Sequence, residues 1–554
     1  MTTIIYNGKL PTLLYDPNCI FTWCPQLNLI FISMNKMSIW CYRINGERIY
    51  SINNKSQIKQ ITFHDKFFCL SGIDNLIKIY NSNDGNLIKI LDYKFNNIQF
   101  LNWNKTEYKL DNDKLSKFPK IYELETKLDY LVVVDDNEII FNFNKLWTIN
   151  LPCEYKITQQ VQSDLFDQVY LSEDKLIRIN FNIENKPLYI DTILKLCQLS
   201  QMMENITSTI KNLETELRTF VIILDRYLSN LNEDIRNVDI FTFLNDLLIT
   251  NLIPESSKDY WLNQFGERGY KKLVKMSTHL KEYCLNTIFQ YLISIMERII
   301  ILVGDINGII KWDKHLIGLD NVDQFLQCCK DLLKFYYKFL WDLRIEFDQF
   351  DEFLNWIKTI LDTLNDQENV ELNYSTSNVL EYINEKLTTP SILKYFKFED
   401  LEFMKNKETD LMVQQHRTFQ NQFELILLSI KNHHSSIISI NLIQSIKLPK
   451  LYTSLKLTKW NNEIIIAYID SNSNLIITSL RKQLSSIPNV KLFEFDQDSL
   501  IALTDKNLLI ININSIIPIQ LPKINFEPKR LCLNNQFGCL ADSKNQNYTI
   551  FKFG

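Results

Sequence analysis

Glycine is scarce in this chain, with 11 residues among 554, and this scarcity limits the chemistry that the sequence can support. Loops that cradle phosphate groups need closely spaced glycines, because only a backbone without side chains can approach a phosphate closely. The sequence contains no GxxxxGK[ST], GxGxxG or GxSxG motif, and the zinc-protease pattern HExxH is also absent. We therefore predict no catalytic residue, no cofactor-binding residue and no small-molecule substrate.

Long apolar runs are missing as well. The longest stretches, such as residues 299–303, fall far short of the roughly 18 apolar residues that suggest a membrane-spanning helix. Residues 1–10 lack the charged segment followed by an apolar one that marks a secretory signal. We expect a soluble intracellular protein with no membrane partner.

Neither sign of charge is in large excess. The formal net charge is -5, so bulk electrostatics give no support for nucleic acid as a partner. With 46% hydrophobic and 23% charged residues, the composition is that of an ordinary globular protein with ample material for a core. The length allows several domains.

Side chains that bind metals are present but poorly grouped. The eleven cysteines are scattered, which predicts reduced core residues, and Cys19 and Cys24 lack a second pair at zinc-ligand spacing. We predict that His433-His434 lies in a solvated loop and that the chain holds no metal. An acidic group, predicted to be solvated on outer helix faces with a docking surface as the alternative, comprises Asp342, Glu346, Asp348, Asp351 and Glu352.

A motif that recurs every 40 residues dominates the region from 20 to 103. Phe21-Thr22-Trp23 returns as Ile61-Thr62-Phe63 and as Leu101-Asn102-Trp103, and Ile39-Trp40 returns as Ile79-Tyr80. An apolar strand, a polar turn and an alternating strand follow each other within each repeat. A period of about 40 residues built from short strands predicts the blades of a β-propeller.

Similar strand pairs recur on both sides of a long helical region. We predict them at residues 131–134 with 139–143, 169–171 with 176–179, 463–468 with 475–478, 500–503 with 508–513, and 538–541 with 548–553. Four units before the helices and three after them predict seven blades, although the fainter units leave six or eight open. A closed ring then needs residues 2–6 or 10–14 as the outer strand of the last blade, and residues 105–127 form a long loop.

A regular helical pattern begins near residue 191. Apolar residues separated by steps of three and four predict a helix over residues 191–228, with Asp191 or Thr192 as its N-cap. The seam comprises Leu196, Leu199, Met203, Ile206, Ile210, Leu213, Leu217, Phe220, Leu224 and Tyr227. We interpret it as one side of an antiparallel bundle within the chain, with an intermolecular coiled coil as the alternative.

Further helices follow this seam. We predict them at residues 259–281, 282–303, 322–350 and 352–364, with another set at 378–430. The predicted fold class is therefore a multidomain β plus α protein, a seven-bladed WD40-like β-propeller interrupted by a long all-helical bundle. The predicted domains are residues 1–185 for the first four blades, 186–440 for the helical insertion and 441–554 for the last three blades.

Several short motifs give the chain a resemblance to a known family. The run Phe21-Thr22-Trp23-Cys24-Pro25, with Ile39-Trp40-Cys41-Tyr42-Arg43 and Glu47-Arg48-Ile49-Tyr50-Ser51, resembles the first propeller blade of the family of subunit 4 of the anaphase-promoting complex. The helical region resembles the same family at Trp261-Leu262, Gly269, Lys271-Lys272-Leu273, Gly318-Leu319, Phe350, Phe353-Leu354 and Trp356.

This resemblance implies a function that composition and spacing do not. It implies a non-catalytic scaffold of a large cullin-RING-type ubiquitin ligase that marks cell-cycle regulators for destruction in mitosis. It also implies a nuclear and cytoplasmic location, and partners that are other subunits of the complex, especially the large subunit 1 and subunit 5 of its platform.

Two other classes remain as alternatives at the level of sequence. A vesicle coat or tethering scaffold also combines propellers with helices, but such subunits usually place a helical solenoid after a completed propeller. A propeller hydrolase would need converging acidic or histidine residues at the strand starts, and we find none in the sequence.

Overall fold

The structure is a computed structural model of the chain. It describes residues 2–553 apart from 11–18, 25, 92, 110–126, 162–163, 174, 236–237, 314–321, 366–371, 407–409, 446–451, 461–462, 480–482, 497–498, 506, 513–514, 522–523, 535 and 543–545. The described residues form two compact units: one is built from those up to 109, from 127 to 197 and from 431 onward, and the other from those between 198 and 430.

The first unit consists of seven four-stranded antiparallel sheets, which confirms the predicted seven-bladed propeller. Blade 1 contains β2–β5, and blades 2 to 6 take the next twenty strands in groups of four. Blade 7 contains β26–β28 and, as its outer strand, β1. The strands of blades 1 to 3 are β2 (Phe21–Cys24), β3 (Leu29–Met34), β4 (Ser38–Arg43), β5 (Arg48–Asn53), β6 (Ile58–His64), β7 (Phe67–Gly72), β8 (Ile77–Asn81), β9 (Leu87–Leu91), β10 (Phe100–Lys109), β11 (Lys127–Val134), β12 (Glu138–Phe143) and β13 (Trp147–Pro152).

Blades 4 to 7 complete the ring. Their strands are β14 (Ile157–Val161), β15 (Asp167–Ser172), β16 (Lys175–Phe181), β17 (Ile438–Ser445), β18 (Tyr452–Trp460), β19 (Glu463–Asp470), β20 (Leu475–Ser479), β21 (Gln483–Ile487), β22 (Val490–Asp496), β23 (Ser499–Thr504), β24 (Asn507–Asn512), β25 (Ser515–Gln520), β26 (Arg530–Asn534), β27 (Phe537–Ala541), β28 (Asn547–Phe553) and β1 (Thr2–Lys9). Blade 4 is split, because β16 and its partner β17 lie on either side of the helical insertion.

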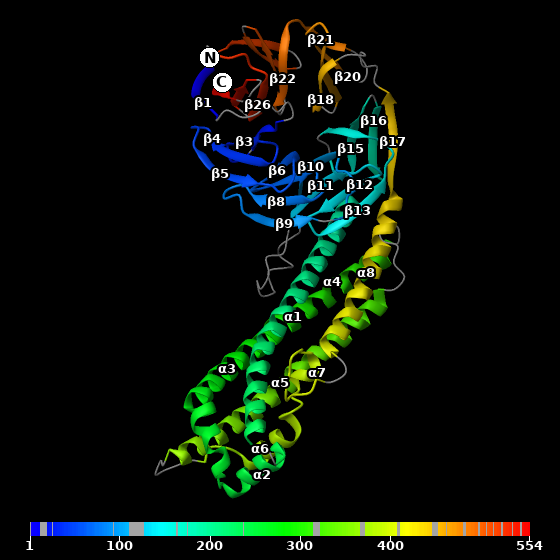
Figure 1. Cartoon of the computed structure of the whole chain (residues 1–554). Coiled ribbons are helices and arrows are strands. Elements are labelled where there is room, and N and C mark those ends of the chain that lie inside the picture. Colours follow the sequence, from blue (N-terminus) through cyan, green and yellow to red (C-terminus); the bar gives the residue numbers. More distant parts are fainter. Residues whose placement is uncertain are drawn as a thin grey trace. The chain divides into compact units, whose positions relative to one another are not determined.

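The two ends of the chain close the ring together. Strand β1 pairs antiparallel with β28, with Thr2 opposite Phe553 and Lys9 opposite Asn547. Figure 1 places the N and C termini in this same blade. The first strands of blades 1 and 7, β2 and β26, also contact each other. Without the contact between blades 1 and 7, each of these two blades would leave one face unburied.

The repeated sequence motif lies in the first strand of blades 1, 2 and 3. Phe21, Ile61 and Leu101 lie in β2, β6 and β10, so the 40-residue period counts successive blades. The hydroxyl of Thr62 accepts a hydrogen bond of 3.1 Å from the backbone N–H of Trp103, which links one copy of the motif to the next. Apolar residues of adjacent blades then fill the space between the sheets. The cluster between blades 7 and 1 includes Trp23, Ile30, Tyr42, Cys539, Tyr548 and Ile550.

The second unit is a helical bundle (Figure 1). Its helices are α1 (Lys186–Ile235), α2 (Ile240–Thr250), η2 (Glu255–Ser257), η3 (Tyr260–Phe265), α3 (Gly266–Asn286), η4 (Thr287–Ile293), α4 (Ser294–Trp312), α5 (Val322–Leu364), α6 (Thr376–Glu381), η5 (Tyr382–Lys386), α7 (Ile392–Tyr395) and α8 (Leu411–Ile437); α1 and α8 begin or end in the first unit. The predicted seam on α1 is buried except at Tyr227, which is half-buried. Its partners are helices of the same chain: the hydroxyl of Thr207 lies 3.1 Å from Nε2 of His416 on α8, and the rings of Phe220 and Phe350 are 5.4 Å apart.

Several helix boundaries differ from the prediction. Helix α1 begins at Lys186, where Asn185 accepts a hydrogen bond from the Leu188 N–H, so the predicted cap at Asp191 or Thr192 is wrong. Asp191 instead pairs with Lys195 one turn later. The predicted break near residue 351 does not exist, because α5 buries Phe347, Phe350, Phe353 and Leu354 without interruption. Likewise α3, η4 and α4 follow one another across residue 281, and α2 was not predicted.

The domain boundaries proposed from the sequence at 185 and 440 stay a prediction. Three other predictions fall largely outside the described residues: most of the closing strand at 10–14, most of the loop at 105–127, and the resemblance at Gly318-Leu319.

Candidate functional site

Buried carboxylates hold non-helical segments onto the helical unit. Asp225 on α1 is almost completely buried and accepts hydrogen bonds from three successive backbone N–H groups. They are those of Glu402 at 2.7 Å, Phe403 at 3.1 Å and Met404 at 2.6 Å. Such charge-assisted bonds satisfy backbone donors that no helix or strand pairs. Asp225 therefore fixes the segment before α8.

Two members of the predicted acidic group, Glu346 and Asp342, hold the segment that carries α7 against helix α5. The Ser391 N–H donates to Glu346, which is buried on α5. Burial raises the pKa of Glu346 to about 7, although the hydrogen bonds from Ser391 and the charge of Lys386 oppose the rise. Asp342 accepts from the hydroxyl of Tyr395 at 2.6 Å and from Lys394 at 3.1 Å. Burial alone would raise the pKa of Asp342, but these two bonds hold it below its usual value.

The remaining acids of that group also bind within the chain. Lys281 on α3 pairs with Asp348 at 2.9 Å and with Asp351 at 2.6 Å. Glu352 accepts a 2.8 Å hydrogen bond from the N–H of Ser375, the residue before α6. The prediction of a solvated acidic face is therefore wrong for Glu346 and incomplete for the others. These carboxylates join helices and connecting segments of the chain to one another.

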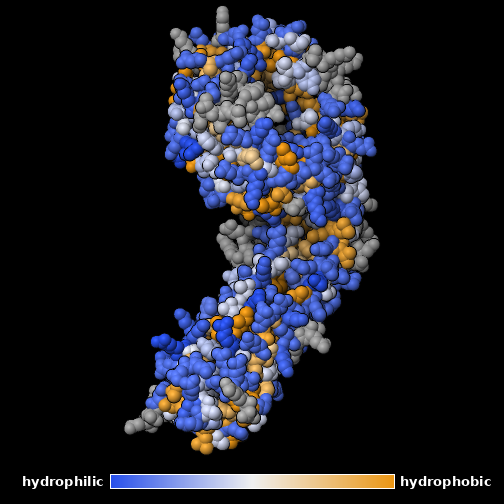
Figure 2. Space-filling view, viewed as in Figure 1, coloured by the Kyte–Doolittle hydropathy of each residue, from blue (hydrophilic) through white to orange (hydrophobic). Residues whose placement is uncertain are grey.

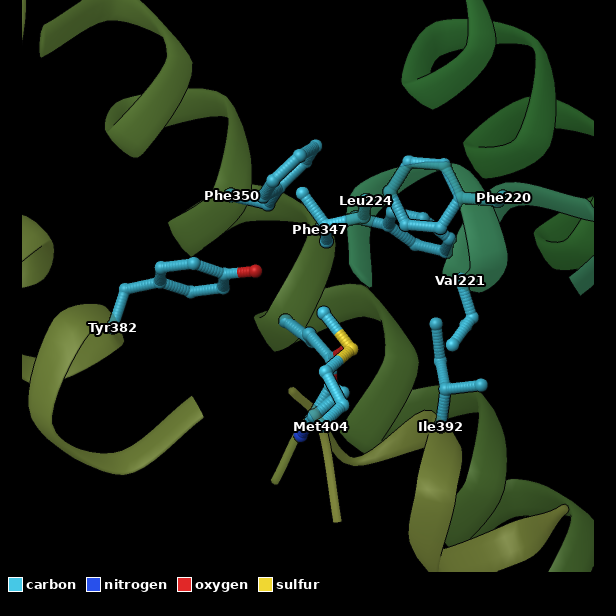
Figure 3. Close-up of a pocket in the computed structure, with 10 residues that line it drawn as sticks. Phe220, Val221, Leu224, Phe347, Phe350, Tyr382, Ile392 and Met404 are labelled. Carbon is cyan, nitrogen blue, oxygen red and sulfur yellow. The ribbon is translucent and has the colours of Figure 1, made fainter. Parts of the chain in front are cut away.

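A small cavity lies beside Glu346 in the core of the helical unit (Figure 3). Its volume is about 10 Å³, close to the minimum for one water molecule. Apolar side chains make up most of the lining, and the hydroxyl of Tyr382 points into the space between them in Figure 3. The lining residues are Phe220, Val221, Leu224, Glu346, Phe347, Phe350, Tyr382, Pro390, Ile392 and Met404. A space of this size does not admit a cofactor or a metabolite.

The histidine pair is placed differently from the prediction. His434 lies in the last turns of α8 and is fully buried, with its ring 5.1 Å from that of Tyr189 and 6.4 Å from that of Trp147. Lys431, one turn earlier, donates to the hydroxyl of Thr148 on β13 at 3.4 Å. The expected solvated loop is thus wrong for His434, which anchors the end of α8 against blade 3.

None of the eleven cysteines forms a disulfide, and nine of them are buried. Cys19 and Cys328 are partly exposed. Burial raises the pKa of Cys41 to about 12 and also raises the pKa of Cys24, so neither thiol is a ready nucleophile at neutral pH. Within the described part of the chain, no three His, Cys, Asp or Glu side chains are grouped so as to hold a metal ion.

The residues that carried the family resemblance in the helical region pack against each other. The ring of Phe353 lies 5.0 Å from that of Tyr382 and 5.6 Å from that of Trp356. Trp261 is buried near the start of the α3 region, 5.1 Å from the ring of Tyr260. These aromatic residues pack within the bundle and stabilise it.

The outer surface of the helices carries exposed apolar side chains that another protein can contact. Figure 2 shows a mostly hydrophilic face on both units, with smaller hydrophobic areas. Large apolar side chains that are more than a third exposed on the helices include Phe289, Trp312, Tyr337, Trp341 and Leu425. None of the described helices combines the length and the apolar character required to cross a bilayer. Exposed aromatic residues of this kind are suited to contacts with other proteins.

Sequence comparison finds two family models that match this chain. Residues 21–106, which span β2 to β10, match the family described as the anaphase-promoting complex subunit 4 WD40 domain. Residues 175–367, from β16 to the end of α5, match the family described as anaphase-promoting complex, cyclosome, subunit 4. The two matches together span about half of the chain and touch both units. No curated protein matches the chain.

Structural comparison finds distant likenesses to solved structures, two of which illustrate the range. The crystal structure of BBS1N in complex with ARL6DN shares 11% identity with a TM-score of 0.20, over 26% of this chain and 43% of that chain. Dihydro-heme d1 dehydrogenase NirN shares 8% identity with a TM-score of 0.23, over 30% of this chain and 34% of that chain. The chain thus spans less than half the length of either protein, and these likenesses carry no argument about function.

The two family matches lie in the order that the fold requires, with the propeller match first and the second match running from blade 4 into the inserted helices. The chain belongs to the family of anaphase-promoting complex subunit 4.

Proposed function

We propose that this chain is a non-catalytic scaffold subunit of the anaphase-promoting complex, a cullin-RING-type ubiquitin ligase that controls mitotic progression and exit. The observation that carries the proposal is the pair of family matches, which fall on the propeller and on the insertion of one chain. Within that complex we expect the large subunit 1 and subunit 5 as direct neighbours, and a nuclear as well as a cytoplasmic location.

The physical character of the two units supports a positioning role. A closed propeller is a rigid ring with broad surfaces, and helices of 50 and 43 residues are stiff elements of considerable length. Buried acidic residues join helices to non-helical segments, as at Asp225 and Glu346. Rigid units with large surfaces and internally paired acids suit the assembly of other subunits.

Affinity purification tests this proposal. The full-length chain, tagged at one end and expressed in its own cells arrested in mitosis, should recover a multi-subunit ubiquitin ligase identified by mass spectrometry. Cross-linking of the recovered complex should join this chain to subunits 1 and 5. Recovery of vesicle-coat proteins, or of the chain alone with hydrolase activity, would reject the proposal.

The scaffold role has its own test. Complexes depleted of this chain should lose ligase activity and lose subunits together, and adding the purified full-length chain back should restore both. If the depleted complex keeps every other subunit but lacks activity, a catalytic role is indicated instead. The purified chain alone should transfer no ubiquitin.

A further inference from the structure

One face of helix α5 points away from the core of the helical unit. Tyr337, Lys338, Trp341, Arg344 and Ile345 are separated by steps of three and four along one side of the helix, and all five are exposed. The opposite side of the same turns is fully buried at Tyr336, Phe339 and Leu343. We call the five exposed residues the basic-aromatic face.

The apolar residues of this face are unusually open to solvent. Trp341 is 62% exposed, Tyr337 45% and Ile345 40%. The helical segment formed by α3, η4 and α4 runs antiparallel to α5 and contributes Phe289, which is 58% exposed. Phe289 falls between two links that tie that segment to α5, the ion pair of Lys281 with Asp348 and the contact of the Tyr337 hydroxyl with Glu297. It therefore lies along the same stretch of α5 as Trp341.

The charges on this face are cationic, and Lys338 also lies close enough to Asp342 to lower the pKa of that carboxyl. Lys338 and Arg344 form no ion pair with any described residue, and the same holds for Lys330 two turns earlier. Of the nearby acids, Asp331 pairs with Lys334, and Asp348 shares Lys281 with Asp351. Between residues 330 and 345, α5 thus carries four cations and two carboxylates, in a chain whose net charge is -5.

We propose that the basic-aromatic face of α5 binds an acidic amphipathic helix of another protein subunit. Apolar residues of that helix, repeated every three or four positions, cover Trp341 and Ile345, and its carboxylates pair with Lys338 and Arg344. Tryptophan, tyrosine and arginine are the residue types that contribute most to protein interfaces. The inference rests on the proposed function, because it names the chemistry of one neighbour within the complex.

The observations favour this occupant over two others. A second copy of this chain would set Lys338 and Arg344 against the same cations, and such like-charge contacts are costly. A nucleic acid backbone needs a continuous basic track, whereas carboxylates of Glu297 and Asp348 border this face on the two helices.

Site-specific photo-cross-linking in the assembled complex tests the occupant. The variant Trp341→p-benzoylphenylalanine of the full-length chain, irradiated in purified complex, should yield one cross-linked peptide with net negative charge and apolar residues at helical spacing. The same replacement at Arg218, which is exposed on α1, is the matched control and should not capture that peptide. A cross-link to a basic segment, to a second copy of this chain or to nucleic acid, or no cross-link, overturns the inference.

Charge reversal separates this inference from the proposed function. The double variant Lys338→Glu/Arg344→Glu should recover the captured subunit about ten-fold less well than wild type, whereas Arg218→Glu should recover it normally. Both variants should unfold at the wild-type temperature, because all three side chains are exposed. If the double variant keeps every subunit, the inference fails while the proposed function stands. If the wild-type chain recovers no ubiquitin ligase, the proposed function itself fails.

Discussion

Asparagine takes many of the backbone positions that glycine fills in other proteins. Among the described residues other than glycine, thirteen have positive φ angles, and six of them are asparagine. Asn35-Lys36 and Asn144-Lys145 each place two such residues in succession, as the tight hairpin turns between β3 and β4 and between β12 and β13 require. Asparagine tolerates this conformation better than most residues. The scarcity of glycine therefore excludes phosphate loops without preventing a fold rich in hairpins.

Glu346 makes the stability of the helical unit depend on pH. Its pKa is about 7 in the folded chain against an ordinary value of 4.5. Between these values the folded state binds more protons than the unfolded state, so stability falls as pH rises, by about 3 kcal/mol in total. The variant Glu346→Gln keeps an acceptor for the Ser391 N–H but cannot ionise.

We therefore expect Glu346→Gln to be more stable than wild type at pH 8 and to show a weaker pH dependence between pH 5 and 8. Thermal unfolding of both proteins over this range checks the expectation. Parallel curves for the two proteins would show that Glu346 does not titrate in this window.

Asp225 should contribute more to the free energy of unfolding than an exposed acid on the same helix. Because three backbone N–H groups lose their acceptor, Asp225→Ala should lower the free energy of unfolding by about 3 kcal/mol or more. Glu216→Ala, an exposed acid on α1, is the control and should change it by less than about 0.5 kcal/mol. Denaturant titration of both variants measures the difference, and equal effects would contradict the role assigned to Asp225.

At the scale of elements, the outer strands of the blades share a protective feature. Strands β1, β5, β9, β17 and β21 each carry one extra residue that disturbs the register with the neighbouring strand. Such bulges hinder the pairing of an exposed edge with another molecule. Strand β13 has no bulge, but Lys431 and His434 of α8 lie against it. Only β25 among the outer strands is both in register and uncovered by a described helix.

Pro518 protects that remaining edge. Pro518 lies opposite Leu509 in the β24–β25 ladder, which has no irregularity. Because proline has no N–H, it fits this ladder only at a position whose N–H would point away from β24, toward the open edge of the blade. Ile516 and Ile517 beside it are about half exposed.

We expect Pro518→Val to create an apolar edge that associates with itself, visible as a higher apparent mass in sedimentation velocity. Adding Gln520→Lys to the same variant places a charge on the edge and should restore the monomer. If Pro518→Val stays monomeric at all concentrations, proline is not what protects β25.

The sequence predicted those elements whose pattern is complete within a short stretch of the chain. Strand pairs were found because β3 and β4, or β27 and β28, alternate and turn within a few residues. Strand β17 was not identified, because its partner β16 lies more than 250 residues earlier and only the fold brings them together. The burial of Glu346 and Asp225 was missed for a related reason. Asp225 follows Leu224 on the buried side of α1, and an acid at such a position is a sign of burial. Its N–H partners could not be predicted, because they lie at residues 402–404, far along the chain.

At the scale of the whole molecule, the fold depends on the two chain ends meeting in blade 7. Strand β1 contributes the outer strand, and Tyr6 also packs against Tyr548, with ring centroids 6.0 Å apart. The helical insertion does not disturb this closure, because it leaves blade 4 after β16 and returns at β17. The prediction of a single ring interrupted by helices is confirmed, and the scaffold role proposed for the chain assumes that ring.

An engineered cross-link tests this closure most directly. Asn7 and Thr549 face each other in β1 and β28, and their side chains are 2.7 Å apart across a hydrogen bond. The variant Asn7→Cys/Thr549→Cys should form an intramolecular disulfide under mild oxidation, seen by mass spectrometry as one peptide joining the two ends of the chain. Thr3→Cys/Thr549→Cys, three pairs out of register, should stay reduced. Failure of the first pair to form, or equal formation by both, would contradict a ring closed by these two strands.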